Sequence, residues 1–107
     1  MTITAQSSER IWREFWISLA SLLRSYTALH GLGSKCQATF EYDEEHITVR
    51  RGENYLGLVR LGQIVTWKLS DGSSGAVDFT EAGQLRSQTG LEEMDMAAER
   101  WARELMN

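Results

Sequence analysis

The sequence predicts an α+β fold in which a long N-terminal helix packs on a five-stranded antiparallel meander sheet and a C-terminal amphipathic helix follows. Apolar residues recur at intervals of three and four near both ends of the chain, as in helices with one buried face. Between residues 36 and 79 the interval changes to two, with short turns between the apolar segments, as in antiparallel strands. The 107 residues, 42% of them hydrophobic, suffice for one core, so we expect residues 1–107 to form a single domain.

The first element is a helix predicted over residues 8–30. Ser7 or Ser8 can cap its first turn, and Gly31 can end it because glycine readily adopts the left-handed conformation. A helix of this length measures about 33 Å and can cross a whole sheet. Its expected buried face carries seven side chains at helical spacing: Trp12, Phe15, Trp16, Leu19, Leu22, Leu23 and Tyr26.

Five short strands follow in the prediction, at residues 36–42, 46–51, 54–61, 63–70 and 76–79. Turns are expected at Asp43-Glu44, Gly52-Glu53 and Leu61-Gly62 and in the longer loop 71–75. A register error of one residue would invert every side chain, so the pairing that keeps one face apolar is strongly favoured. That face is expected to lie under the first helix, and it carries Phe40, Tyr42, Ile47, Val49, Leu56, Leu58, Val65, Trp67, Leu69, Val77 and Phe79.

The opposite face of the predicted sheet is polar except at one hairpin. Its polar members are Thr39, Glu41, Thr48, Arg50, Thr66, Lys68 and Asp78. The hairpin of the third and fourth strands adds four apolar side chains, Tyr55, Val59, Leu61 and Ile64. Burying four such side chains fully contributes roughly 6 to 10 kcal/mol, which is comparable with the whole stability of a small domain. We therefore expect something to cover them.

The C-terminal segment is predicted to form a second helix after a capping box at Thr89 to Glu92. A short helical turn over residues 80–86 is expected to connect it to the last strand. Its apolar face is predicted to carry Leu91, Met94, Ala97, Ala98, Trp101 and Leu105. The opposite side carries charged residues, which indicates an amphipathic helix.

Three coverings of the hairpin are compatible with this pattern: the chain's own C-terminal helix, a second subunit, or another protein. Four side chains offer roughly 400 to 500 Å², less than the roughly 800 Å² per partner of a standard interface, so the C-terminal helix must contribute. We favour a homodimer slightly over the other two. Its expected interface comprises Tyr55, Val59, Leu61, Ile64, Met94, Trp101 and Leu105, with Arg50 and Lys68 as a possible contact for an anion or an acidic partner.

Catalytic and metal chemistry has little support in the sequence. Cys36 with His30 or His46 is the one nucleophile pairing available, and we interpret Cys36 as a packed, inert thiol because its strand register points it toward the core while His46 points away. Two histidines and one cysteine at these spacings do not make a zinc site. We therefore predict no catalytic residue, no metal site and no cofactor.

The charge and the cysteine content limit which partners and which cellular location are expected. Fifteen acidic against eleven basic residues argue against binding to nucleic acid. The uncharged apolar run from Phe15 to Leu23 is far shorter than the roughly 20 residues that span a bilayer, so we expect no membrane insertion. A single cysteine fits a reducing compartment, and a cytoplasmic location is predicted.

These features favour a small acidic protein without enzymatic activity that acts by interaction, as a binding, chaperone-like or inhibitor-like accessory protein and as a homodimer. The alternative is an α+β domain that binds a small ligand, or catalyses a reaction, in a cavity between the N-terminal helix and the sheet. Four tryptophans in so short a chain favour that alternative only weakly, because aromatic side chains more often fill a core.

Overall fold

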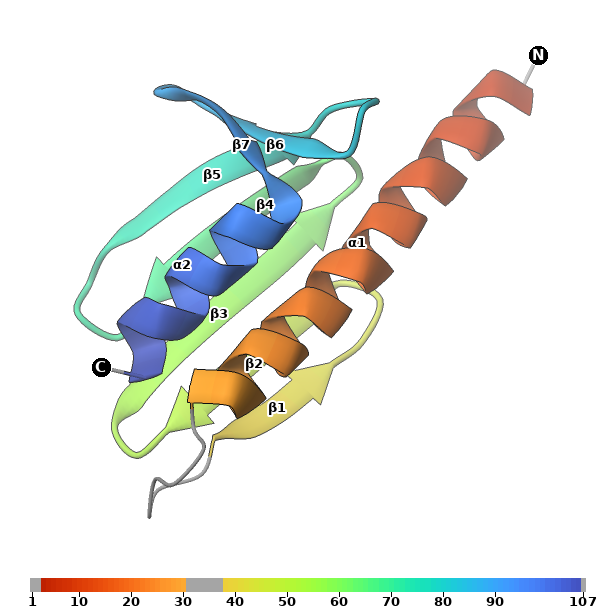
Figure 1. Ribbon diagram of the computed structural model, residues 1–107. Helices are drawn as coiled ribbons and strands as arrows, with labels where there is room; N and C mark the ends of the chain where they lie inside the picture. Colours follow the sequence, from red (N-terminus) through yellow and green to blue (C-terminus); the bar gives the residue numbers. More distant parts are fainter. Residues whose placement is uncertain (1–2, 31–37, 107) are drawn as a thin grey trace.

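The structure, a computed structural model, describes residues 3–30 and 38–106 (Figure 1). Within them the elements follow in the order α1 (Ile3–His30), β1 (Thr39–Tyr42), β2 (His46–Arg51), β3 (Asn54–Leu61), β4 (Ile64–Leu69), β5 (Ser74–Phe79), β6 (Gln84–Ser87), β7 (Gly90–Glu93) and α2 (Met94–Met106). The strands form one antiparallel meander in the order β1 to β7. The predicted α+β fold, with a helix at each end of an antiparallel sheet, is confirmed. The predicted number of strands is wrong, because the described residues contain seven.

The first five strands place the predicted side chains on each face of the sheet. The β3–β4 turn lies one residue later than predicted, which shifts the cross-strand partners by two residues and leaves the faces unchanged. Phe40 lies opposite Val49, and Leu58 lies between Ile47 and Trp67 on its two neighbouring strands. The face so formed is the core face: Ile47, Val49, Leu56, Leu58, Val65 and Phe79 are fully buried or nearly so. Tyr42 was expected among them and is 45% exposed, because β1 is the edge strand of the sheet.

The two helices lie side by side on this core face (Figure 1). For α1, the ring of Phe15 packs against that of Phe79, with centroids 5.8 Å apart. For α2, the ring of Trp101 packs against that of Trp67, with centroids 6.4 Å apart. Phe79 and Trp67 both belong to the core face, so the helices share one side of the sheet. No described helix covers the other side.

An ion pair of a buried arginine with a partly exposed glutamate ties α1 to the sheet. Arg60 at the end of β3 is 5% exposed, and its Nη1 donates to Oε1 of Glu9 at 3.1 Å. The same guanidinium also donates to the carbonyl oxygens of Glu44 and Gly62. Burying a charged group is costly unless it is paired and hydrogen-bonded, and here the guanidinium donates to three oxygen atoms. Arg60 thus fixes α1 relative to β3 and to the β1–β2 turn.

The segment between β5 and α2 differs from the prediction. Residues 80–86 were expected to form a helical turn and Thr89 to Glu92 a capping box, but residues 81–83 form a non-helical turn, and β6 and β7 follow at Gln84–Ser87 and Gly90–Glu93. Gly83 and Gly90 have positive φ angles of 83° and 132°, which place a turn before each strand. The hydroxyl of Thr89 bonds to that of Ser87 within the hairpin and caps no helix. Strands of four residues, with one buried side chain in β6 and none in β7, are too short to show a period of two.

Several boundaries also shift. The first helix begins at Ile3, so Ser7 and Ser8 lie inside it and not before it. The fifth strand begins at Ser74, which shortens the expected loop 71–75. The fourth strand begins at Ile64, so the turn lies at Gly62 and Gln63. The start of the first predicted strand and Gly31 fall outside the described residues.

Candidate functional site: the open face of the sheet

The side of the sheet away from α1 and α2 is here called the open face. On it, the β3–β4 hairpin presents Val59 at 43%, Leu61 at 79% and Ile64 at 51% exposure. Tyr55, the fourth apolar side chain expected there, is half-buried at the other end of β3. Contiguous exposed aliphatic side chains are unusual on a sheet that faces water, and they mark this hairpin as the candidate site.

Strand pairing sets the order of these side chains. Leu61 and Ile64 are direct partners across the β3–β4 turn, and Val59 is the partner of Thr66. From Ile64 the pairing continues to Asp78 on β5, to Arg86 on β6 and to Leu91 on β7. We call these five residues, Leu61, Ile64, Asp78, Arg86 and Leu91, the apolar-ended row, because an ion pair separates the aliphatic side chains at its two ends.

Leu91 is a member of the site that sequence reasoning missed. It was expected on the buried face of the C-terminal helix, but it lies on β7 and is 60% exposed. Its partner across the β6–β7 hairpin is Arg86, which places it on the open face. The only sequence signal was the pair of glycines, Gly83 and Gly90, that flank β6 and β7.

The ion pair in the middle of the row is hydrogen-bonded on several sides. The guanidinium of Arg86 donates to both carboxylate oxygens of Asp78 through Nε and Nη2. This hydrogen bond to Asp78 raises the pKa of Arg86 above its usual range. Gln63 donates from Nε2 to Asp78 at 3.2 Å and to the carbonyl oxygen of Phe79 at 2.8 Å. Since the pair is fixed by the protein itself, a partner that covers Ile64 meets an ordered polar surface beside it.

The charges of the open face balance. Arg50 and Lys68, predicted as a contact for an anion or an acidic partner, lie on β2 and β4 with β3 between them, and both are exposed. The guanidinium carbon of Arg50 lies 5.9 Å from the ring centroid of Tyr55, within the range of a cation–π contact. Strand alternation places on this face three acidic residues, Glu41, Asp78 and Glu93, and three basic ones, Arg50, Lys68 and Arg86.

The C-terminal residues of the predicted interface lie elsewhere. Met94, Trp101 and Leu105 are 8%, 1% and 2% exposed and belong to the core between α2 and the sheet. The sheet itself separates them from Val59, Leu61 and Ile64, so the structure does not bring the two halves of the predicted interface together. Helical periodicity shows that one face of α2 is buried, but it does not show which side of the sheet receives it.

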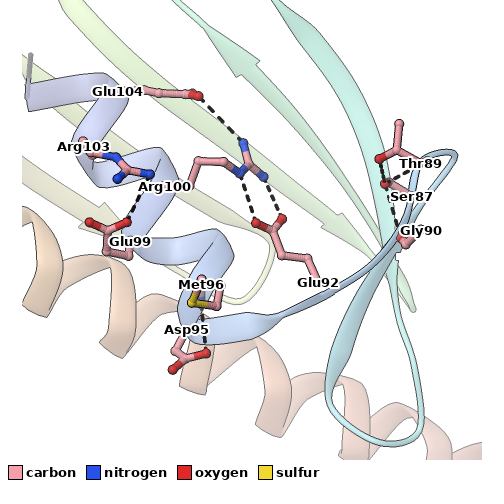
Figure 2. Close-up of polar contacts among 10 residues, drawn as sticks. All are labelled: Ser87, Thr89, Gly90, Glu92, Asp95, Met96, Glu99, Arg100, Arg103 and Glu104. Atoms are coloured by element: carbon pink, nitrogen blue, oxygen red, sulfur yellow. Dashed lines mark hydrogen bonds and ion pairs between the residues drawn. The ribbon is translucent and has the colours of Figure 1, made fainter.

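Ion pairs hold α2 in this position (Figure 2). Arg100 on α2 donates from Nε and Nη2 to the two carboxylate oxygens of Glu92 on β7, at 3.1 and 2.9 Å. On its other side Arg100 reaches Glu104 one turn further along α2. The hydrogen bond to Glu92 raises the pKa of Arg100 above its usual range. The bidentate contact connects the middle of α2 to the β6–β7 hairpin.

Of the two histidines and the cysteine considered for catalysis or metal binding, the structure describes the side chain of His46. His46 is exposed, and its Nδ1 lies 3.2 Å from Oδ1 of Asp43 in the β1–β2 turn. Cys36 lies outside the described residues, and His30 is the last residue of α1. Across residues 3–30 and 38–106, no group of three or more histidine, cysteine, aspartate or glutamate side chains could hold a metal ion.

The space proposed for the alternative function, between the N-terminal helix and the sheet, is occupied by side chains of α1. Trp16, Leu19 and Leu23 are fully buried there, and Nε1 of Trp16 donates to the carbonyl oxygen of Asp43 at 2.9 Å. A hollow of about 340 Å³ opens at the rim, where Ile17 and Arg24 of α1 face β1. The contact is therefore packed at its centre, and the hollow lies at its edge.

Comparisons with protein-family models, with curated proteins and with solved structures found no match. Among the described residues, no helix is both long enough and apolar enough to cross a membrane.

Proposed function

We propose that this chain is an interaction protein without enzymatic activity and that its open face binds a second copy of the same chain. The observation that supports this most is the exposure of Val59, Leu61 and Ile64 on a sheet face that no described helix covers. A homodimer formed by packing two such faces removes all three side chains from water in both subunits. The accessory role predicted from the sequence, as a chaperone-like or inhibitor-like protein, remains part of this proposal.

The size of the open face supports an interface that uses all of it. Seven strands spaced about 4.8 Å apart span about 29 Å, and six residues of strand measure about 20 Å. The product is roughly 600 Å² in projection, and side chains that stand out of the plane bring the accessible area toward the roughly 800 Å² per partner of a standard interface. The hairpin alone is too small, so Leu91 and the intervening polar rows must contribute.

The charge balance of the face favours a second copy as the partner. The whole chain carries a net charge of −4, so two copies repel each other weakly at a distance. The open face carries three acidic and three basic side chains, so this repulsion does not extend to the surface where the copies meet. In a two-fold arrangement each patch meets itself, and a neutral face with charges of both signs can satisfy that condition.

The proposal is tested by charge substitutions on the open face. Ile64→Glu and Val59→Lys are expected to leave the chain folded and to raise the dissociation constant of the dimer by roughly 30-fold or more, because an unpaired charge in a dry interface costs about 2 to 5 kcal/mol. Sedimentation at micromolar concentration measures the assembly, and circular dichroism reports the fold.

Two controls make the result specific. Ile17→Glu introduces the same change at a similarly exposed position, 47% exposed on α1, and is expected to leave the dimer intact. Leu58→Ala removes a core side chain and is expected to cost about 2 to 5 kcal/mol of folding free energy. A wild-type chain that sediments as a monomer, or an Ile64→Glu variant that unfolds as readily as Leu58→Ala, contradicts the proposal.

A further inference from the structure

The pairing between β5 and β6 is much shorter than either neighbouring contact. β5 has six residues, yet only Asp78 and Phe79 pair with β6, opposite Arg86 and Leu85. Beyond them the β6–β7 hairpin diverges from β5 (Figure 1). A cleft of about 790 Å³ lies between the two, lined on one side by residues 74–77 and on the other by residues 87–91. This volume is within the range of ligand sites.

Main-chain N–H and carbonyl groups of β5 point into this cleft. The N–H of Phe79 donates to the carbonyl oxygen of Gln63, and the carbonyl oxygen of Ser73 accepts from Leu69, so the odd-numbered residues of β5 bond to β4. In an antiparallel ladder the direction alternates, and Ser74 and Ala76 therefore point their N–H and carbonyl groups outward. Among the described residues no hydrogen-bond partner is found for them. Their spacing is that of alternate strand residues, about 7 Å.

The floor of the cleft is apolar and uncharged overall. The ring of Trp67 lies close against the backbone of Gly75, where a Cβ atom would come within 2.8 Å of it, and Val77 and Leu85 also line the cleft. The two charged residues of the lining, Arg100 and Glu92, are bonded to each other. The cleft therefore has no unmatched cation to bind a phosphate or a carboxylate.

We propose that this cleft binds an extended, uncharged peptide segment of another protein, which adds as a strand to the free edge of β5. An extended backbone supplies acceptors and donors at the spacing of Ser74 and Ala76, which a compact small molecule does not. A β-branched or other apolar side chain of the peptide then lies over Trp67, and neutral side chains match the balanced lining. This site lies at the edge of β5 and on the core-face side of the sheet; it shares Leu91 with the open face but not Val59, Leu61 or Ile64.

Amide exchange resolved by NMR tests the free edge directly. In the free protein the amides of Ser74 and Ala76 are expected to exchange quickly and those of Gly75 and Val77 slowly. The probe is an acetylated, amidated peptide with the sequence Lys-Thr-Val-Thr-Val-Thr-Val-Lys, at about 1 mM. It is expected to slow exchange at Ser74 and Ala76 by about tenfold or more and to change tryptophan fluorescence. The same peptide with its central amides N-methylated is expected to do neither.

Variants at Ala76 complete the test. Ala76→Pro removes the outward N–H and is expected to abolish peptide protection at Ser74, because proline is tolerated at a strand edge but cannot donate. Ala76→Thr keeps the N–H, so the peptide is expected still to protect the amide of Ser74 in this variant. Repeating the titration in Ile64→Glu separates this site from the dimer, since peptide binding there is expected to be unchanged.

Three results overturn the proposal. The first is slow exchange at Ser74 and Ala76 in the free protein, which shows that the edge is already paired. The second is equal protection by the methylated peptide. The third is protection that rises with protein concentration alone, which assigns the edge to a second copy.

Discussion

At the scale of single residues, the close contact between Gly75 and Trp67 decides how the large ring is accommodated. The two residues are partners across β4 and β5, and the ring lies where a side chain at position 75 would stand. Trp67 can therefore pack against Trp101 of α2 while it remains half-buried at the floor of the cleft. A sequence pattern shows a glycine near a strand, but the ring that requires it is eight residues away.

Gly75→Ala is expected to lower the free energy of unfolding by about 1 to 3 kcal/mol, because the added methyl overlaps the Trp67 ring at 2.8 Å. The matched control is Gly57→Ala on β3, where an added Cβ meets nothing within 4 Å. That variant is expected to be neutral or to stabilise slightly. Because Gly57 lies on the open face, both variants are made in the Ile64→Glu background, which is expected to be monomeric. Urea unfolding measures both, and equal effects would show that Trp67 moves aside freely.

At the scale of elements, the β1–β2 turn is organised by one carboxylate. Oδ1 of Asp43 accepts the backbone N–H groups of Glu45 at 2.8 Å and His46 at 2.7 Å. These bonds, that of Glu45 first, hold the pKa of Asp43 below its ordinary value. The main chain of Asp43 also accepts the indole N–H of Trp16, so the turn orients both a strand pair and the helix above it.

The lowered pKa of Asp43 predicts the sign of a pH effect. Its contribution to stability is fully present above the pKa of the unfolded chain and is lost as pH falls through the lower pKa of the folded state. Asp43→Asn keeps an acceptor that does not titrate, so its unfolding free energy is expected to depend less on pH below about 4 than that of the parent chain. Urea unfolding between neutral and acidic pH, in the monomeric Ile64→Glu background, measures this. Parallel pH profiles would contradict the assignment.

At the scale of the whole molecule, the decisive feature is that both helices use the same face of the sheet. The contact between α1 and α2 and the ring pairs on Phe79 and Trp67 place them there together. A seven-stranded sheet covered on one side leaves the other exposed, and Val59, Leu61 and Ile64 lie on that side. The molecule is elongated, 53 × 26 × 20 Å, with the N-terminal turns of α1 extending past the sheet (Figure 1).

Self-association through the open face predicts a melting temperature that depends on concentration. Binding that is restricted to the folded state stabilises it by mass action, so a hundredfold increase in protein concentration is expected to raise Tm on the order of 5 °C. Ile64→Glu is expected to melt at one temperature throughout the same range. Differential scanning fluorimetry over that range measures both, and a constant Tm for the parent chain would contradict dimerisation.

The periodicity of the chain by itself determined the two helices and which side chains of β1 to β5 share each face of the sheet. Each of these depends on which side chains share a surface within one element or between adjacent strands, and that is a local property of the sequence. Leu19 on α1 and Leu56 on β3 are buried for this reason.

Only the tertiary structure decided the rest. An amphipathic helix is equally well buried on either side of a sheet as far as its own pattern is concerned, so the position of Trp101 on the core face could not be derived from its spacing. The strands β6 and β7 form because β5 offers them an edge, through contacts such as that between Asp78 and Arg86, and four residues carry too little periodicity to compete with a capping-box pattern. The exposure of Ile64 and the placement of Leu91 on the same open face, three strands away, both follow from these two long-range choices.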